Sequence, residues 1–299
     1  MNDPSSSGAT ACNSELKSVV VGIDASVPSQ KALDWAAEEA VRRSVPLRIV
    51  HSWSLARYHL TPEYRTDIGE SVLEGAKSLV QQSRSRILEE HSGLQVDSEV
   101  VPEEPAQGLI RMAGNDSLLV VGTRGHNRFA AAMLGSVGRR LVAHAPVPVV
   151  VVRAAETPHS GEVVLGVAPG EADSTIEFAF AEAQRRSVPL RAIRTWMYPQ
   201  SYPGGIVIPP RDRILRDHAE DADLTEVLAR AHKALPDVEV VQQVTLDEPE
   251  AALVDASAAA SLIVIGAQRR KHPLAMPMGH VVQRVLHHAQ CPVAVIPHS

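Results

Sequence analysis

Two glycines and a glycine–serine pair in the first half of the chain have the residue types and spacing of an anion-binding loop. Gly122 and Gly125 follow an apolar run, and Gly135 and Ser136 come after nine intervening residues, where a helical pattern begins. Glycine turns tightly and lets backbone N–H groups approach an anion, because no Cβ intervenes. A helix beginning at Gly135 adds free N–H groups and its dipole, and Ser136 can donate its hydroxyl. This spacing predicts a phosphate-binding loop.

Charged residues near these glycines fit the same chemistry. Arg124 and Arg128 lie inside the loop and could neutralise negative charge, and Asp24 could accept a hydrogen bond from a ribose hydroxyl. Asp24 could equally be the N-cap of the helix that follows, and the glycines could serve plain turns. No G-x-x-x-x-G-K-[ST] segment is present, so P-loop chemistry is not indicated.

The whole chain is an internal tandem repeat with an offset of 143 to 144 positions. The segment EEAVRRSVPLRIVHSW matches AEAQRRSVPLRAIRTW, VVVGID matches VVLGVA, LLVVG matches LIVIG, and HAPVPVVVV matches HAQCPVAVI, in the same order. The second copy keeps Gly266 and Gly279. It has Ala168, Arg269 and His280 at the positions of Asp24, Gly125 and Ser136. These changes predict that the second copy is degenerate and structural, although Arg269, Arg270 and Lys271 could bind another anion if they are not simply solvated.

Each repeat alternates apolar runs with helix-like stretches. In the first repeat we expect strands at 18–24, 47–52, 94–101, 118–121 and 147–152, and helices at 29–44, 70–91, from Pro105 and at 137–144, with a loop at 56–69. The second repeat follows this order, with a long loop at 197–212. Uninterrupted apolar strands separated by helices predict an α/β fold with two tandem doubly wound domains, in which a parallel sheet is covered on both faces. Ligands of such sheets lie beyond the carboxyl ends of the strands, where Gly22–Ser26 and the glycine loop are expected.

These repeats suggest domains at 17–153 and 162–298, after a flexible tail at 1–16 and with a short linker at 154–161. The 299 residues carry 29 Lys and Arg against 35 Asp and Glu, a formal charge of −6 that argues against nucleic-acid binding. The N-terminus lacks the pattern of a secretory signal, no run is long enough to span a membrane, and Cys12 and Cys291 form no disulfide framework. We therefore expect a cytoplasmic protein without membrane partners.

No catalytic constellation is evident. His280, Arg284, His287 and His288 lie on neighbouring helical turns, but they have no matched carboxylate or thiolate, so no metal site is expected. His51 ends a strand near the expected pocket without a nucleophile partner, and no serine stands in a G-x-S-x-G elbow. We therefore expect a binding protein rather than an enzyme.

Taken together, the motifs resemble those of the universal stress protein family. The resemblance rests on G-x2-G-x9-G-[ST] at 122–136, the V-G-I-D-x-S start, the H-A-x-x-P-V-x-V-V ending and the tandem arrangement typical of actinobacterial members, and it covers about residues 17–298. It implies a five-stranded parallel sheet of order 3-2-1-4-5 in each half, dimers, and a nucleotide-dependent regulator in the stress response with an unknown protein partner. It also implies ATP, with or without Mg²⁺, and at most slow ATP hydrolysis; AMP or another adenine nucleotide would suit the motif as well.

The resemblance also assigns binding roles to residues of the first repeat. Asp24 would lie near the sugar, the backbone of Ser52 near adenine, and residues 122–128 and 135–137 around the phosphates. The candidate nucleotide-binding residues are Gly22, Ile23, Asp24, Ser52, Gly122, Thr123, Arg124, Gly125, His126, Asn127, Arg128, Gly135, Ser136 and Val137.

Two other classes of function remain open at this stage. The chain could be a nucleotide-free dimeric scaffold, in which the apolar last strands PVPVVVV and PVAVI, if they are sheet edges, pair with another chain. It could also be a module like those of electron-transfer flavoproteins, which share the architecture and bind FMN or FAD.

Overall fold

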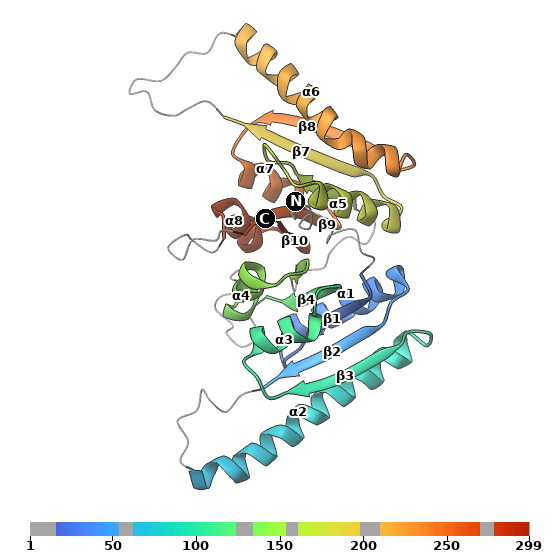
Figure 1. Cartoon of the computed structure of the whole chain (residues 1–299), viewed down its shortest axis with the longest axis vertical. Helices are drawn as coiled ribbons and strands as arrows, with labels where there is room; N and C mark the ends of the chain where they lie inside the picture. Colours follow the sequence, from blue (N-terminus) through green and yellow to red (C-terminus); the bar gives the residue numbers. More distant parts are fainter. Residues whose placement is uncertain are drawn as a thin grey trace, which may run out of the picture.

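Ten strands form one continuous sheet that runs through the whole molecule (Figure 1). The computed structural model describes residues 16–53, 62–123, 134–153, 161–197, 210–269 and 278–298. The strand order is β3-β2-β1-β4-β5-β10-β9-β6-β7-β8, so each half has the predicted order 3-2-1-4-5. We call β1–β5 with their helices domain 1 and β6–β10 with theirs domain 2. The predicted domain boundaries stay a prediction, and the predicted tail lies almost wholly outside the described residues.

Strands and helices alternate in both domains. The elements of domain 1 are β1 (Ser18–Gly22), α1 (Val27–Arg43), β2 (Leu47–Ser52), α2 (Pro62–Glu90), β3 (Val96–Val101), α3 (Pro105–Ala113), β4 (Ser117–Gly122), α4 (Ser136–His144) and β5 (Val149–Val152). Those of domain 2 are β6 (Val163–Gly166), α5 (Asp173–Arg186), β7 (Leu190–Trp196), α6 (Pro210–Ala234), β8 (Val240–Leu246), α7 (Pro249–Ala256), β9 (Leu262–Gln268), α8 (His280–His288) and β10 (Val293–His298). Pairing is parallel within each domain.

The repeated segment RRSVP ends a helix in the same way in both halves. Ser44 and Ser187 each take the left-handed conformation with φ of 54° and donate their N–H groups back to the last helical turn. A left-handed residue at this position satisfies otherwise unpaired carbonyls and stops the helix. The following Val-Pro then leads into β2 or β7, so the local sequence repeats the turn.

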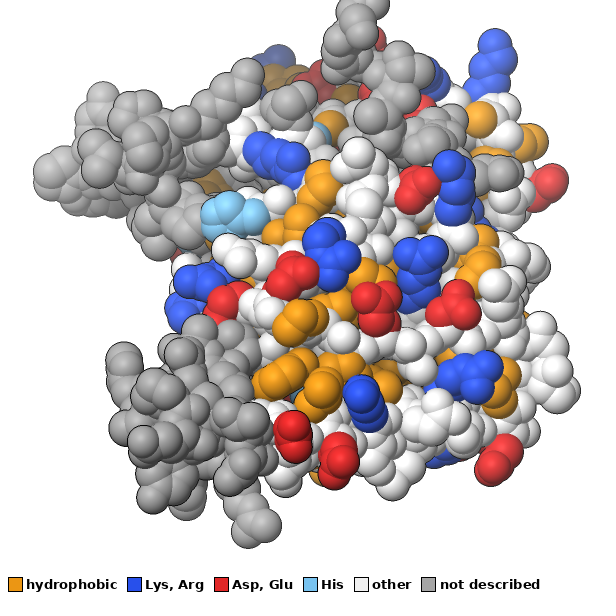
Figure 2. All heavy atoms as spheres, turned by 60° about the horizontal axis from the view of Figure 1, so that its bottom comes forward, with side chains coloured by type: hydrophobic (Ala, Val, Ile, Leu, Met, Phe, Trp, Pro, Cys, Tyr) orange, Lys and Arg blue, Asp and Glu red, His pale blue; other side chains and the backbone are white. Residues whose placement is uncertain are grey.

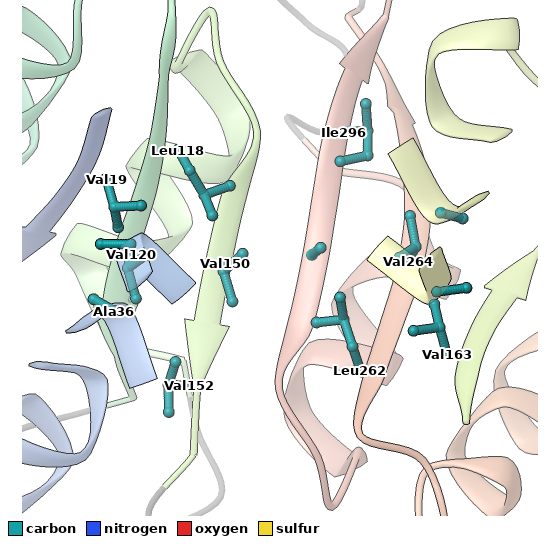
Figure 3. Packing of buried hydrophobic residues seen from close by; sticks show 14 of the residues in the cluster. Val19, Ala36, Leu118, Val120, Val150, Val152, Val163, Leu262, Val264 and Ile296 are labelled. Atoms are coloured by element: carbon teal, nitrogen blue, oxygen red, sulfur yellow. The ribbon is translucent and has the colours of Figure 1, made fainter. Parts of the chain in front are cut away.

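The two domains meet where β5 and β10 pair antiparallel, with Val149 opposite Val295 and Val151 opposite Val293. The expectation that these last strands are free edges for another chain is therefore wrong. Figure 3 shows the apolar core on both sides of this junction, with Val150 and Val152 on one strand and Ile296 on the other. Two adjacent parallel sheets with matching apolar strands bury each other's edges, which leaves β3 and β8 as the outer strands.

Two layers of helices cover this sheet. α1, α2, α5 and α6 contribute to one buried cluster, and α3, α4, α7 and α8 contribute to the other. Because both faces are covered, the central strands are almost wholly apolar, as the sequence predicts; Ser18 and Ser117, which begin β1 and β4, are buried and hydrogen-bond to each other at 2.8 Å.

One helix begins earlier than predicted. α2 starts at Pro62, inside the segment expected to be a loop at 56–69, and proline is compatible with a first helical position. The second predicted loop, 197–212, lies mostly outside the described residues, and α6 begins at Pro210.

The outer strand of domain 1 carries charge. Asp97 and Glu99 of β3 are exposed, which discourages further strand pairing. Figure 2 shows the face at this end of the molecule, where acidic and basic side chains alternate with hydrophobic ones and no field of a single sign dominates. Among the described residues no helix has the length and hydropathy to cross a bilayer.

Candidate functional site

A cleft of about 490 Å³ opens at the carboxyl ends of β1, β2 and β4 in domain 1. Its volume is within the range of about 300–1,000 Å³ that is typical of small-molecule sites. Lining residues come from the strand ends and from the first turns of α1, α3 and α4. They are Gly22, Ile23, Asp24, Ser29, Val50, His51, Ser52, Pro105, Leu109, Val121, Gly122, Thr123, Gly135, Ser136, Val137 and Gly138.

The Asp24 carboxylate sits at the exit of β1 and is held by its neighbour. Its Oδ1 accepts from the backbone N–H of Ser26, at 2.9 Å, and from the Ser26 hydroxyl. Ser26, not Asp24, is the N-cap of α1, because the Ser26 side chain accepts from the Ser29 N–H. The alternative interpretation of Asp24 as the helix cap is therefore wrong. Asp24 is the one carboxylate among the described residues that line the cleft.

Two side chains at the end of β2 are anchored to backbone carbonyls. His51 Nδ1 lies 2.8 Å from the carbonyl oxygen of Ile23, so this nitrogen must carry a proton to donate. In neutral His51 the other ring nitrogen, Nε2, is then an acceptor. The Ser52 hydroxyl donates to the Glu103 carbonyl at 2.6 Å, which fixes the end of β2 against the loop before α3.

Glycine is required at the strand ends by close packing. A Cβ on Gly22 would lie 2.7 Å from Leu109 Cδ1, and a Cβ on Gly122 would lie 2.5 Å from the Pro28 carbonyl oxygen. The contact at Gly122 is with the backbone of α1, which cannot move aside as a flexible side chain can. Gly122 thus has a packing role, whatever ligand the loop holds.

The N-terminus of α4 faces the same cleft. Gly135 is its N-cap, with φ of −67° and ψ of 167°, and no side chain caps the helix. Ser136, Val137 and Gly138 form the first turn and line the cleft. N–H groups of a first turn have no partner within the helix, so they are available to a ligand.

Every candidate residue that the structure describes lies at this cleft. Nine of them line it, namely Gly22, Ile23, Asp24, Ser52, Gly122, Thr123, Gly135, Ser136 and Val137, and the remaining five, Arg124 to Arg128, lie outside the described residues. Seven lining residues were not among the candidates: Ser29, Val50, His51, Pro105, Leu109, Val121 and Gly138. Val50 and His51 could have been found, because they immediately precede Ser52 on the same strand. Pro105 and Leu109 depend on how α3 docks, which no local pattern reveals.

The corresponding place in domain 2 contains acidic side chains. Ala168 takes the position of Asp24, and its N–H donates to Glu171 Oε2 at 3.3 Å. In domain 1 the N–H of Asp24 donates to the Ser29 hydroxyl. The Glu171 side chain is only 5% exposed. It lies so close to Gly266 that a Cβ there would be in contact with its carboxylate.

A carboxylate of domain 2 also contacts the first residue of α8. His280, at the position of Ser136, places Nε2 at 3.0 Å from Glu250 Oε1 at the start of α7. Arg269, at the position of Gly125, donates to the Ala145 carbonyl of domain 1. The Arg269 guanidinium therefore has a partner within the chain, while the residue itself is exposed. Anion binding by this run stays a prediction, and Arg270 and Lys271 lie outside the described residues.

Comparison with known proteins identifies the family. The family model described as the universal stress protein family matches residues 15–153 and again residues 161–297. The chain belongs to the universal stress protein family. It is 32% identical over 298 residues to the universal stress protein Rv2623 of Mycobacterium tuberculosis, covering 95% of this chain and 97% of that protein. It is 30% identical over 290 residues to the universal stress protein Rv2005c of the same species, covering 93% and 96%.

Solved structures agree on the fold. A universal stress protein from Archaeoglobus fulgidus superimposes with a TM-score of 0.64 at 18% identity, covering 95% of this chain and 99% of that one. At this level of identity the likeness shows the architecture: two α/β domains with parallel sheets between helices.

Proposed function

We propose that domain 1 of this universal stress protein binds an adenine nucleotide, ATP in the first place. The observation that carries the proposal is the convergence of the N-terminus of α4 with the ends of β1 and β4 on one cleft of suitable volume. The phosphates would bind the free N–H groups at Ser136 and Val137 and lie beside Gly122 and Thr123 at the end of β4. The sugar would lie near Asp24, and the base near the end of β2, at Ser52.

The described residues suit such a ligand. Apolar side chains of Val50, Leu109 and Val121 offer a surface for a base, and hydroxyls and backbone groups face it from the other elements. Asp24 could accept from ribose through Oδ2, because the bonds to Ser26 use Oδ1. If Mg²⁺ accompanies ATP, it would take its ligands mainly from phosphate and water, as this ion commonly does, because the lining offers one carboxylate.

Domain 2 is, in this proposal, a degenerate partner. Two carboxylates lie near the corresponding place in domain 2, Glu171 beside Ala168 and Gly266 and Glu250 beside His280, and negative charge there opposes a phosphate. The loss of the Asp24 carboxylate at Ala168 removes a further contact. The protein would then bind one nucleotide per chain.

Nucleotide occupancy would set the conformation of the chain or its choice of partner in a stress response, in the cytoplasm. Among the described lining residues, Asp24 and His51 could act as a general base, Asp24 through Oδ2 and His51 through Nε2. Hydrolysis of ATP would be slow at most. A homodimer would need a surface other than β5 and β10, since these strands pair within the chain. The alternative of a nucleotide-free scaffold depended on β5 and β10 being free edges, and these strands pair with each other.

The test is to purify the protein without added nucleotide, denature it, and identify the released compounds by HPLC against ATP, ADP, AMP, FMN and FAD. Calorimetry with added ATP gives the number of sites. About one adenine nucleotide per chain supports the proposal, and two per chain shows that domain 2 binds as well. A flavin, or no binding even with added ATP, would refute it.

Variants that exchange residues between the repeats locate the site. Ser136→His and Asp24→Ala introduce into domain 1 the residues of domain 2, and each should weaken ATP binding by about tenfold, the effect of about 1.4 kcal/mol. The matched controls are His280→Ser and Ala168→Asp, which should leave the affinity of domain 1 unchanged. Weakening by the controls instead would place the site in domain 2.

A further inference from the structure

Arg269 connects domain 2 to the helix that borders the cleft of domain 1. It follows β9, and its N–H donates to the His298 carbonyl at 2.8 Å, which fixes its backbone beside the end of β10. Its guanidinium reaches across the junction and donates to the carbonyl oxygen of Ala145. The two residues are 124 positions apart in the chain.

Ala145 is the C-cap of α4. Its own N–H returns to the Leu141 carbonyl at 2.7 Å, and its extended conformation, with ψ of 133°, ends the helix without a glycine. The last carbonyls of a helix lack partners within it and form its negative end. A guanidinium from Arg269 satisfies one carbonyl at that end and brings a positive charge to it.

The two ends of α4 therefore have different tasks. The helix has nine residues, so it is about 13 Å long, and Leu141 anchors its middle in the core. Its first turn, Ser136 to Gly138, lines the cleft, while its last turn is held by domain 2. Rigid secondary-structure elements of this kind can carry energetic coupling between two sites.

We propose that Arg269 is a positioning residue for the cleft: it holds α4 in the orientation that presents its N–H groups to the ligand, and so couples domain 2 to ligand binding in domain 1. This inference rests on the proposed function. It gives a physical reason for the loss of the glycine in the second repeat, because a glycine at 269 could not reach Ala145. Domain 2 thereby contributes to a site in domain 1.

A second arginine provides the matched control. Arg153 follows β5 and donates from one guanidinium nitrogen to the carbonyls of Leu286 and His287 in the last turn of α8, at 3.0 and 3.1 Å. It makes the same kind of contact in the opposite direction, to a helix whose first turn does not line the cleft. Removing it should disturb the junction without moving α4.

The experiment compares Arg269→Ala, Arg269→Lys and Arg153→Ala in the full chain, by calorimetry with ATP and by hydrogen exchange of the α4 amides without nucleotide. We expect Arg269→Ala to weaken ATP binding about fivefold or more, a coupling of ordinary size between sites. It should also speed exchange in α4. Arg269→Lys should restore part of the ATP affinity and part of the slow exchange in α4. Arg153→Ala should change neither the affinity nor the exchange.

The outcomes separate this inference from the proposed function. If the wild-type protein binds ATP and Arg269→Ala binds it equally well, or Arg153→Ala weakens binding as much, the positioning role is overturned while the proposed function stands. If the wild-type protein binds no nucleotide, the proposed function fails and the coupling to ATP with it. Exchange in α4 then decides whether Arg269 orients the helix: faster exchange in Arg269→Ala alone supports that role, and unchanged exchange overturns it.

Discussion

Glu39 and Glu182, one from each domain, share the same two arginines. Arg43 donates to Glu39 at 2.6 Å and to Glu182, and Arg186 donates to Glu39 at 2.7 Å and to Glu182. Both carboxylates are fully buried. The arginines also lie over aromatic rings of the opposite domain, Arg43 over Phe178 and Arg186 over Trp35. The repeated motif E-x2-R-R thus contacts its own copy and joins α1 to α5.

The first prediction concerns this cluster. Burial opposes ionisation of Glu39, but the charges of Arg186, Arg43 and Arg42 outweigh it and lower its pKa from 4.5 to about 2. Glu39→Gln removes one of the two buried carboxylates that balance Arg43 and Arg186, so we expect a loss of about 3–5 kcal/mol in the free energy of unfolding at neutral pH. Denaturant unfolding measures it.

The pH dependence of that loss has a defined sign. A carboxyl with a lowered pKa in the folded protein adds stability above its ordinary pKa, and this contribution disappears as the pH falls through the lowered value. The difference between wild type and Glu39→Gln should therefore be largest above about pH 4.5 and shrink toward pH 2. Burial and the charge of Glu39 raise the pKa of Glu182.

The control is Glu38→Gln, because Glu38 is a more exposed neighbour on the same helix. Its stability is measured at each pH beside that of wild type and Glu39→Gln. An equal deficit in Glu38→Gln would contradict the assignment.

The second prediction compares two glycines of the repeated motif, Gly122 from the first copy and Gly279 from the second. Gly122→Ala places a Cβ 2.5 Å from the Pro28 carbonyl oxygen and should cost about 1–3 kcal/mol in stability, because the backbone of α1 must shift. Gly279→Ala is the control: nothing lies within 4 Å of a Cβ there, and its φ is −59°. Thermal and denaturant unfolding of both variants test this, and an equally destabilised Gly279→Ala would show that packing is not the reason.

The third prediction concerns Cys291. Its side chain is fully buried, and burial raises the pKa of the thiol to about 12. The thiolate is the reactive form, so Cys291 should not react with a thiol reagent in the folded protein at pH 8. A Cys12→Ser variant isolates it, and reaction should appear only after unfolding. Rapid labelling of the native variant would contradict the buried position.

Much of the fold could be predicted from the sequence, since its signals are local. Val-rich runs give buried strands, and the paired RRSVP segments give two identical helix ends at Ser44 and Ser187. The glycine spacing predicts a site at the ends of β1 and β4, where the cleft lies. The start of α2 at Pro62 was missed because its polar first turns carry no apolar periodicity.

By itself the sequence determined the duplication, the α/β class and the position of the candidate site, because hydrophobic period, turn residues and helix caps act between near neighbours in the chain. Only the tertiary structure decided that β5 and β10 close the sheet between the domains, that Glu39 and Glu182 share their arginines, and that Arg269 reaches Ala145. These contacts join residues more than 100 positions apart. They form when the two folded domains pack against each other, and the local patterns of the sequence do not specify which residues then meet.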